Sequence, residues 1–77
     1  MYVKYKEILI NIKNISYFAV NDHEIFFYGH HEFYLSIPFR DHSVAFLAFE
    51  LITRYLVENP IMIDLEVLMN EYLDPKI

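Results

Sequence analysis

Four histidines are the residues of this chain best suited to metal binding or proton transfer: His23, His30, His31 and His42. His30 and His31 are adjacent, and imidazole is the commonest metal ligand. Adjacent residues in a turn point in diverging directions, however, and no His-x₃-His spacing completes a ligand set. We therefore expect solvated turn histidines. The alternative is a regulatory module that binds a metal or a small ligand through this turn and a tyrosine-rich sheet face.

Hydroxyl and carboxyl groups give no catalytic pattern. No serine lies in a Gly-x-Ser-x-Gly context, and the single glycine excludes a glycine-rich phosphate loop. Glu24 and Glu32 flank a predicted sheet edge, where carboxylates mainly add solubility. Cysteine is absent, which excludes thiol nucleophiles, zinc–thiolate sites and disulfides. We predict that the chain is not an enzyme and binds no cofactor.

Charge is distributed unevenly along the 77 residues. The chain has 11 acidic and 6 basic side chains, for a net charge of −5, and most of the acidic excess follows residue 49. No basic stripe is present to neutralise phosphates, so we predict no direct nucleic-acid binding. The acidic third is either an ordinary solvated helix face or a surface for a basic partner protein. Its candidate residues are Glu58, Glu66, Glu71 and Asp74.

Apolar content is high for so short a chain. Hydrophobic residues make up 56% of it and aromatic residues 18%, against a typical apolar content of about 45–50%. A domain of this size buries only roughly 60% of the surface of its unfolded chain. This surplus predicts an oligomer or an exposed binding patch.

The N-terminal residues do not resemble a signal peptide, because no long apolar core follows Lys4 and Lys6. The longest apolar tract, 44–57, is interrupted by charged residues and is shorter than the ~20 residues that span a bilayer. We expect a soluble cytoplasmic protein that does not enter the membrane. The abundance of Ile, Phe, Tyr, Asn and Lys, which have AT-rich codons, indicates a phage, viral or AT-rich bacterial source.

Residues 7–37 predict an antiparallel β-meander of three to four strands, within a single α+β domain that spans 1–77. Short runs of β-branched and aromatic residues are separated by polar pairs; the runs are 7–12, 15–20, 23–28 and 32–37. Asn21-Asp22 suits a two-residue hairpin loop, which places Tyr17 opposite Phe26. A three-residue loop at 29–31 gives the best sorting of apolar side chains.

Both faces of this predicted sheet are apolar. One face collects Ile25, Phe27, Phe33, Leu35 and Ile37, and the other collects Ile15, Tyr17, Phe26, Tyr28 and Tyr34. An antiparallel sheet with one solvated face alternates apolar with polar residues, which this sheet barely does. The tyrosine-bearing face therefore needs a second helix, another subunit or a ligand to cover it.

Two helices are predicted after the meander. The first spans 41–58, with Asp41 or Ser43 as its N-cap, and ends at Asn59-Pro60. The second is short, spans 65–73 and has Asp64 as its N-cap. The long helix is apolar most of the way round, which is typical of a helix buried on more than one side. Either the short helix or a second copy of the chain covers the additional apolar side of the long helix.

The apolar surplus favours a small non-enzymatic interaction module. We expect a homodimer that acts as an inhibitor, adaptor or regulator of another protein, since tyrosine and phenylalanine are enriched at interfaces. The residues expected at the partner or dimer interface are Tyr17, Phe26, Tyr28, Tyr34, Phe46, Phe49 and Leu56.

Overall fold

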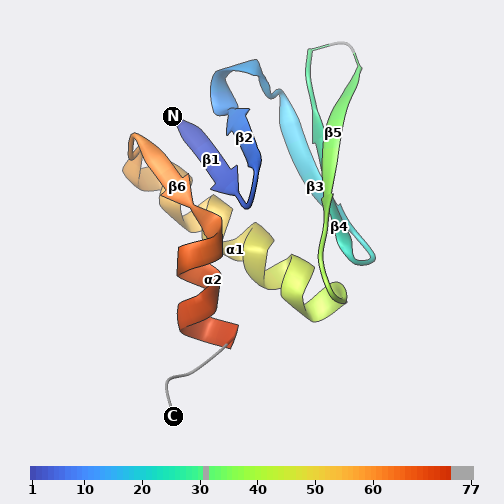
Figure 1. Cartoon of the computed structure of the whole chain (residues 1–77). Helices are drawn as coiled ribbons and strands as arrows, with labels where there is room; N and C mark the ends of the chain where they lie inside the picture. Colours follow the sequence, from blue (N-terminus) through green and yellow to red (C-terminus); the bar gives the residue numbers. More distant parts are fainter. Residues whose placement is uncertain (31, 74–77) are drawn as a thin grey trace.

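The computed structural model describes residues 1–30 and 32–73 (Figure 1). It confirms the predicted α+β class, with a three-stranded antiparallel meander, a long helix and a short C-terminal helix. The elements in order are β1 (Tyr2–Tyr5), β2 (Ile8–Asn11), the 3₁₀ turn η1 (Ile12–Asn14), β3 (Tyr17–Asn21), β4 (Glu24–Tyr28), β5 (Phe33–Pro38), α1 (His42–Glu58), β6 (Met62–Asp64) and α2 (Leu65–Leu73).

The strands form two sheets, with the orders β2-β1-β6 and β3-β4-β5. The predicted strand at 7–12 is β2, but it pairs with β1 and does not extend the meander. Strand β6 pairs in parallel with β1, so Tyr2 lies beside Met62 and Val3 beside Ile63. Neither β1 nor β6 was among the strands predicted from the sequence. The second sheet therefore ties the start of the chain to the segment between the helices.

The β3–β4 hairpin has a different register from the predicted one. Its loop is Asp22-His23, because Asn21 remains in the strand opposite Glu24. Asp22 adopts a left-handed conformation with φ 59°, which aspartate tolerates better than most residues. Tyr17 consequently lies opposite Tyr28, where Phe26 was predicted. This register differs by two residues, and a shift of two keeps every side chain on its predicted face.

A bulge in β5 changes the face of one predicted core residue. Phe27 pairs with Leu35 but Tyr28 pairs with Phe33, so Tyr34 is an extra residue in β5. An extra residue reverses the alternation beyond it. Phe33, which was predicted on the core face, is 51% exposed and packs its ring against Tyr28 on the opposite face. Ile15 was also placed wrongly, because it precedes β3 and packs against the core.

Both helices begin at the predicted caps. The Asp41 carboxylate accepts a hydrogen bond from the Val44 amide at 3.0 Å, and Asp64 accepts one from Val67 at 3.2 Å. Helix α1 ends at Glu58, and its C-cap Asn59 has a left-handed φ of 52° just before Pro60. Helix α2 packs against α1 and β1. This is the first of the two predicted alternatives, in which the short helix covers part of the long one. Within residues 1–30 and 32–73, no helix is long and apolar enough to cross a membrane.

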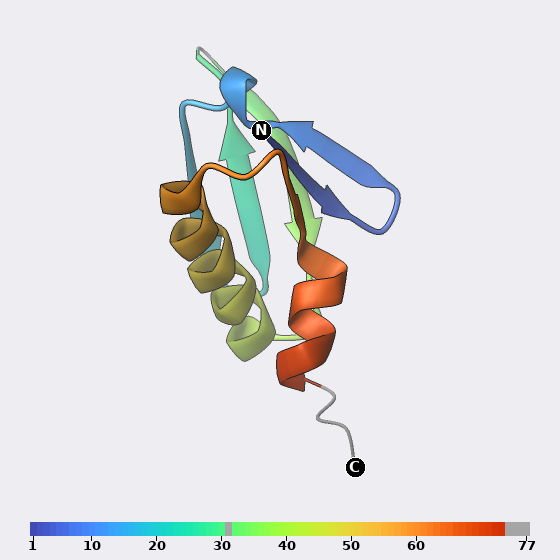
Figure 2. The same cartoon turned by 90° about the vertical axis from the view of Figure 1, so that its left-hand side faces the viewer.

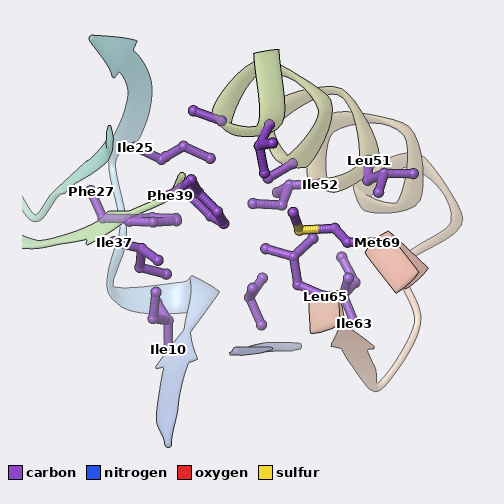
Figure 3. Close-up of a cluster of buried hydrophobic side chains, with 14 residues drawn as sticks. Ile10, Ile25, Phe27, Ile37, Phe39, Leu51, Ile52, Ile63, Leu65 and Met69 are labelled. Atoms are coloured by element: carbon purple, nitrogen blue, oxygen red, sulfur yellow. The ribbon is translucent and has the colours of Figure 1, made fainter. Parts of the chain in front are cut away.

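One hydrophobic core joins both sheets and both helices. Figure 2 shows the two helices side by side in front of the β3-β4-β5 sheet, with β1 and β2 beside them. In Figure 3, Ile10 from β2 meets Ile37 from β5, while Leu65 and Met69 from α2 meet Ile52 from α1. Ile10, Ile52 and Leu65 are fully buried. This core covers only the inner face of the β3-β4-β5 sheet.

Candidate interaction surfaces

Four aromatic rings form a connected cluster on the outer face of the β3-β4-β5 sheet. Tyr17 from β3 stacks on Tyr28 from β4, with ring centroids 4.6 Å apart and planes within 11°. Phe33 from β5 contacts Phe26 at 5.9 Å and Tyr28 edge-on at 6.0 Å. The register places these side chains together, since Tyr28 is paired with Tyr17 on one side and Phe33 on the other. We call this cluster the aromatic face: Tyr17, Phe26, Tyr28 and Phe33.

The aromatic face is turned away from the rest of the chain. In Figure 1, α2, the other sheet and most of α1 lie to the left of the β3-β4-β5 sheet, and α1 begins below it. Tyr17 is 57% exposed and Phe33 51% exposed, while Phe26 and Tyr28 are half-buried. Their neighbouring rings account for part of that burial. Such rings bury large apolar areas, and offset or edge-on pairs add about 0.5–1.5 kcal/mol each. The cluster is thus rigid and accessible.

A second apolar surface lies along α1 beside the β3 strand. Phe46 is half exposed and stacks on Phe49 at 6.3 Å, and Phe49 contacts Phe18 at 5.3 Å. Between α1 and β3 is a hollow of about 390 Å³. We call it the β3–α1 groove; its lining residues are Ile12, Ile15, Ser16, Tyr17, Phe18, Phe49, Thr53 and Leu56. None of them is charged.

The structure thus divides the predicted interface residues into two groups. Tyr17, Phe26 and Tyr28 lie together on the aromatic face. Phe46, Phe49 and Leu56 lie on α1 near the groove, on the inner side of the same sheet. Tyr34 is the bulge residue of β5 and is 46% exposed. Phe33 was missed because the bulge that turns it outward has no glycine or proline to signal it.

The predicted acidic residues are spread around the C-terminal part of the fold. Glu58 lines a hollow with Asp64 and Val67, whereas Glu66 lines a different one. Glu71 is exposed on α2, and Asp74 lies outside the described residues.

The histidines make separate contacts. The His30 Nδ1 atom lies 3.1 Å from the Ser16 hydroxyl, and the His42 Nδ1 atom lies 2.7 Å from the Asp22 carbonyl oxygen. His31 lies outside the described residues. In the part of the chain that the structure describes, no three His, Cys, Asp or Glu side chains gather as a metal site would require. The His30 contact joins the segment after β4 to the start of β3, and the His42 contact joins the start of α1 to the β3–β4 hairpin loop.

His23 and Asp22 form a pH-dependent pair in the β3–β4 hairpin loop. Its Nδ1 atom lies 2.9 Å from the Asp22 carboxylate, and this hydrogen bond raises the pKa of His23 above its ordinary value and lowers the pKa of Asp22. A raised folded-state pKa means that the contribution to stability is full below the ordinary histidine pKa and is lost as pH rises through the folded value.

We expect an NMR titration to place the His23 midpoint above that of an unstructured histidine, and Asp22→Asn to lower it. The effect on unfolding should be small because both groups are exposed. An unchanged midpoint in Asp22→Asn would show that the pair does not form in solution.

A hollow of about 610 Å³ lies between β1, β5 and α2. Its charged lining residues are Lys6, Arg40 and Glu66. The Arg40 Nε atom donates a hydrogen bond to Asp41 at 3.3 Å, so this guanidinium is already engaged. No serine, threonine or histidine is among the lining residues.

Comparison with known proteins assigns no family to the chain. Its sequence matches no model of a known protein family, and no curated protein or solved structure is significantly similar to it. The function proposed below therefore depends on the surfaces described above.

Proposed function

We propose that the chain is a small non-enzymatic module that binds another protein through the aromatic face and thereby acts as an inhibitor, adaptor or regulator. The observation that carries this proposal is the cluster of four packed rings on the outer sheet face, with Tyr17 and Phe33 more than half exposed. An exposed apolar patch of this kind marks an interaction site on a soluble domain. The absence of cysteine supports a reducing compartment, the cytoplasm, as the place of action.

The shape of the aromatic face favours a protein partner over a small ligand. Small-ligand sites are concave and enclose most of the ligand, whereas this cluster lies on the face of a sheet. Tyrosine and phenylalanine supply large contact areas at a low cost in conformational entropy. Rings fixed by strand pairing and mutual stacking lose even less freedom on binding.

The aromatic face differs in charge from a sheet that binds RNA. Sheets that bind RNA stack bases on aromatic rings, but they also need basic residues to neutralise phosphates. The strands β3, β4 and β5 contain no lysine or arginine, and Glu24 lies at the end of β4. Glu32 adds a second carboxylate just before β5. We infer that the partner offers an apolar patch with basic residues at its rim.

A capture experiment with the intact chain tests this proposal. We expect wild-type chain to retain a specific partner from lysate of the source cells or their host. The double variant Tyr17→Ser/Phe33→Ser should lose that partner. Both rings are about half exposed, so circular dichroism should show an unchanged fold.

The matched control is Leu9→Ser/Tyr72→Ser, which removes one aliphatic and one aromatic side chain of similar exposure elsewhere. This control should retain the partner. Equal capture by the aromatic-face variant and by wild type would refute the assignment of the binding surface.

A further inference from the structure

Strand β3 is an edge of its sheet, and its outer side carries backbone hydrogen-bonding groups that β4 does not use. The amide of Phe39 donates to the carbonyl of His23 at 2.8 Å, which marks these two as a hydrogen-bonded pair. Such pairs recur at every second residue of an antiparallel ladder. Ile25 and Phe27 therefore bond to β5, and the alternate residues of β4 bond to β3.

The same alternation fixes the open edge of β3. The residues of β3 that bond to β4 are those opposite Glu24, Phe26 and Tyr28, namely Asn21, Ala19 and Tyr17. Phe18 and Val20 then direct their N–H and C=O groups away from the sheet. An edge of this kind is a template for another strand.

The β5 and β2 edges carry features that discourage such pairing, and β3 does not. The β5 edge has a bulge and ends at Pro38. The β2 edge has only four residues and runs directly into the 3₁₀ turn that contains Lys13. From Ile15 to Asn21 the chain has no charge, proline or glycine. Charged residues, prolines and bulges are the usual means by which edges are kept from pairing.

We propose that a second copy of this chain pairs with the β3 edge, so that two β3 strands run antiparallel about a two-fold axis at Ala19. Alignment of all five residues of each strand places Phe18 opposite Val20 of the second copy, which joins the outward-directed backbone groups. Ala19 then faces Ala19 at a non-hydrogen-bonded pair, where strands approach most closely, about 4.5 Å between Cα atoms. Alanine leaves room for this approach.

The uncharged surface beside β3 allows a second copy to occupy this edge. The chain has a net charge of −5, so two copies repel each other over most of their surface. The β3–α1 groove has no charged lining residue and is where two copies can approach without like-charge contact. The strand added at β3 would cover Phe18 and Phe49, which line that groove from β3 and from α1 and contact each other.

The helices fit this arrangement. Helix α1 contacts β3 and β4, so a two-fold axis beside β3 places both α1 helices on the same side of the joined sheet. Phe49 lines the groove beside β3 and stacks on Phe46, so these two rings would face the second copy. The product is a continuous six-stranded sheet with helices on one side and two aromatic faces on the other.

This dimer goes beyond the proposed partner binding and does not depend on it. Tyr17 belongs to both surfaces, with its backbone on the β3 edge and its ring stacked on Tyr28 in the aromatic face. Light scattering on a size-exclusion column tests it. We expect wild-type chain at tens of micromolar to have twice the mass of the 9.3 kDa chain. Ala19→Lys and Ala19→Glu should each be monomeric, since each places like charges opposite one another. An equimolar mixture of the two variants should restore the dimer.

Ser36→Lys is the matched control, because Ser36 shares the outer face but lies on β5, with β4 between it and β3. This variant should remain dimeric. A monomeric wild-type chain, or a dimeric Ala19→Lys, would overturn the proposal.

Amide hydrogen exchange on wild-type chain gives a test that does not depend on the folding of any variant. The amides of Phe18 and Val20 should be protected at concentrations where the dimer forms and should exchange rapidly on dilution. Rapid exchange of both amides at every concentration contradicts pairing at this edge.

Discussion

Phe27→Ala is expected to lower the free energy of unfolding by about 3–5 kcal/mol, the range for a fully buried phenylalanine. Phe27 has no exposed surface and stacks on Phe18, with ring centroids 5.6 Å apart. A chain of this length has a total stability of roughly 4–12 kcal/mol. The substitution should therefore remove a large part of it, as urea unfolding followed by circular dichroism would measure.

Phe33→Ala is the matched control, since it removes the same side chain from the opposite face of the same sheet. Phe33 is 51% exposed, so we expect a loss of about 1 kcal/mol, mainly from its contacts with Phe26 and Tyr28. Phe27→Ala should thus lower the free energy of unfolding far more than Phe33→Ala. Equal losses of stability would mean that the two faces are not inner and outer as described.

Ile10→Ala is expected to destabilise the whole chain by about 2–5 kcal/mol. Ile10 is fully buried where the β2-β1-β6 sheet meets the core. Because Val3, its partner on β1, also pairs with Ile63 on β6, the first and last strands belong to the same packed unit. Unfolding should stay cooperative, with far- and near-ultraviolet circular dichroism shifting together.

Leu9→Ala provides the control for this prediction. Leu9 is the neighbouring residue of β2 and is 55% exposed, so the change should be within about 0.5 kcal/mol. If Ile10→Ala instead produced two separate transitions, the second sheet would be an independent unit and not part of the shared core.

The elements formed by local signals were predictable from the sequence. Helix α2 spans the predicted residues, α1 starts one residue after the predicted boundary, and Asp41 and Asp64 act as the predicted caps. Capping and helix ends depend on neighbouring residues, so a single sequence contains the necessary information. The meander strands likewise follow from runs of β-branched and aromatic residues.

The second sheet was not predictable in this way. Strand β1 has only four residues, and Lys4 interrupts its apolar pattern. Strand β6 has three residues and pairs with β1 across almost the whole chain. Parallel pairing over such a separation has no turn signal between the strands, and it depends on the core that Val3 and Ile63 share. Contacts between distant parts of the chain therefore determine that β1 and β6 form.

The candidate site was predicted in part. Alternation placed Tyr17, Phe26 and Tyr28 on one face, and an error of two residues in the hairpin register left that result unchanged. Phe33 required the bulge at Tyr34, which shifts the alternation by one residue. Phe46, Phe49 and Leu56 were predicted at the same interface, but they lie apart from the aromatic face because α1 packs on the inner side of the sheet. The sequence alone does not show on which side α1 packs.

Hydroxyl-radical footprinting of the chain, alone and in complex with the captured partner, tests the central claim that the aromatic face is the binding surface. Tyr17 and Phe33 should be oxidised readily in the chain alone and protected in the complex. Tyr72, a comparably exposed tyrosine on α2, should be oxidised equally in both. Protection of Tyr72 with no change at Tyr17 and Phe33 would place the partner elsewhere and contradict the account.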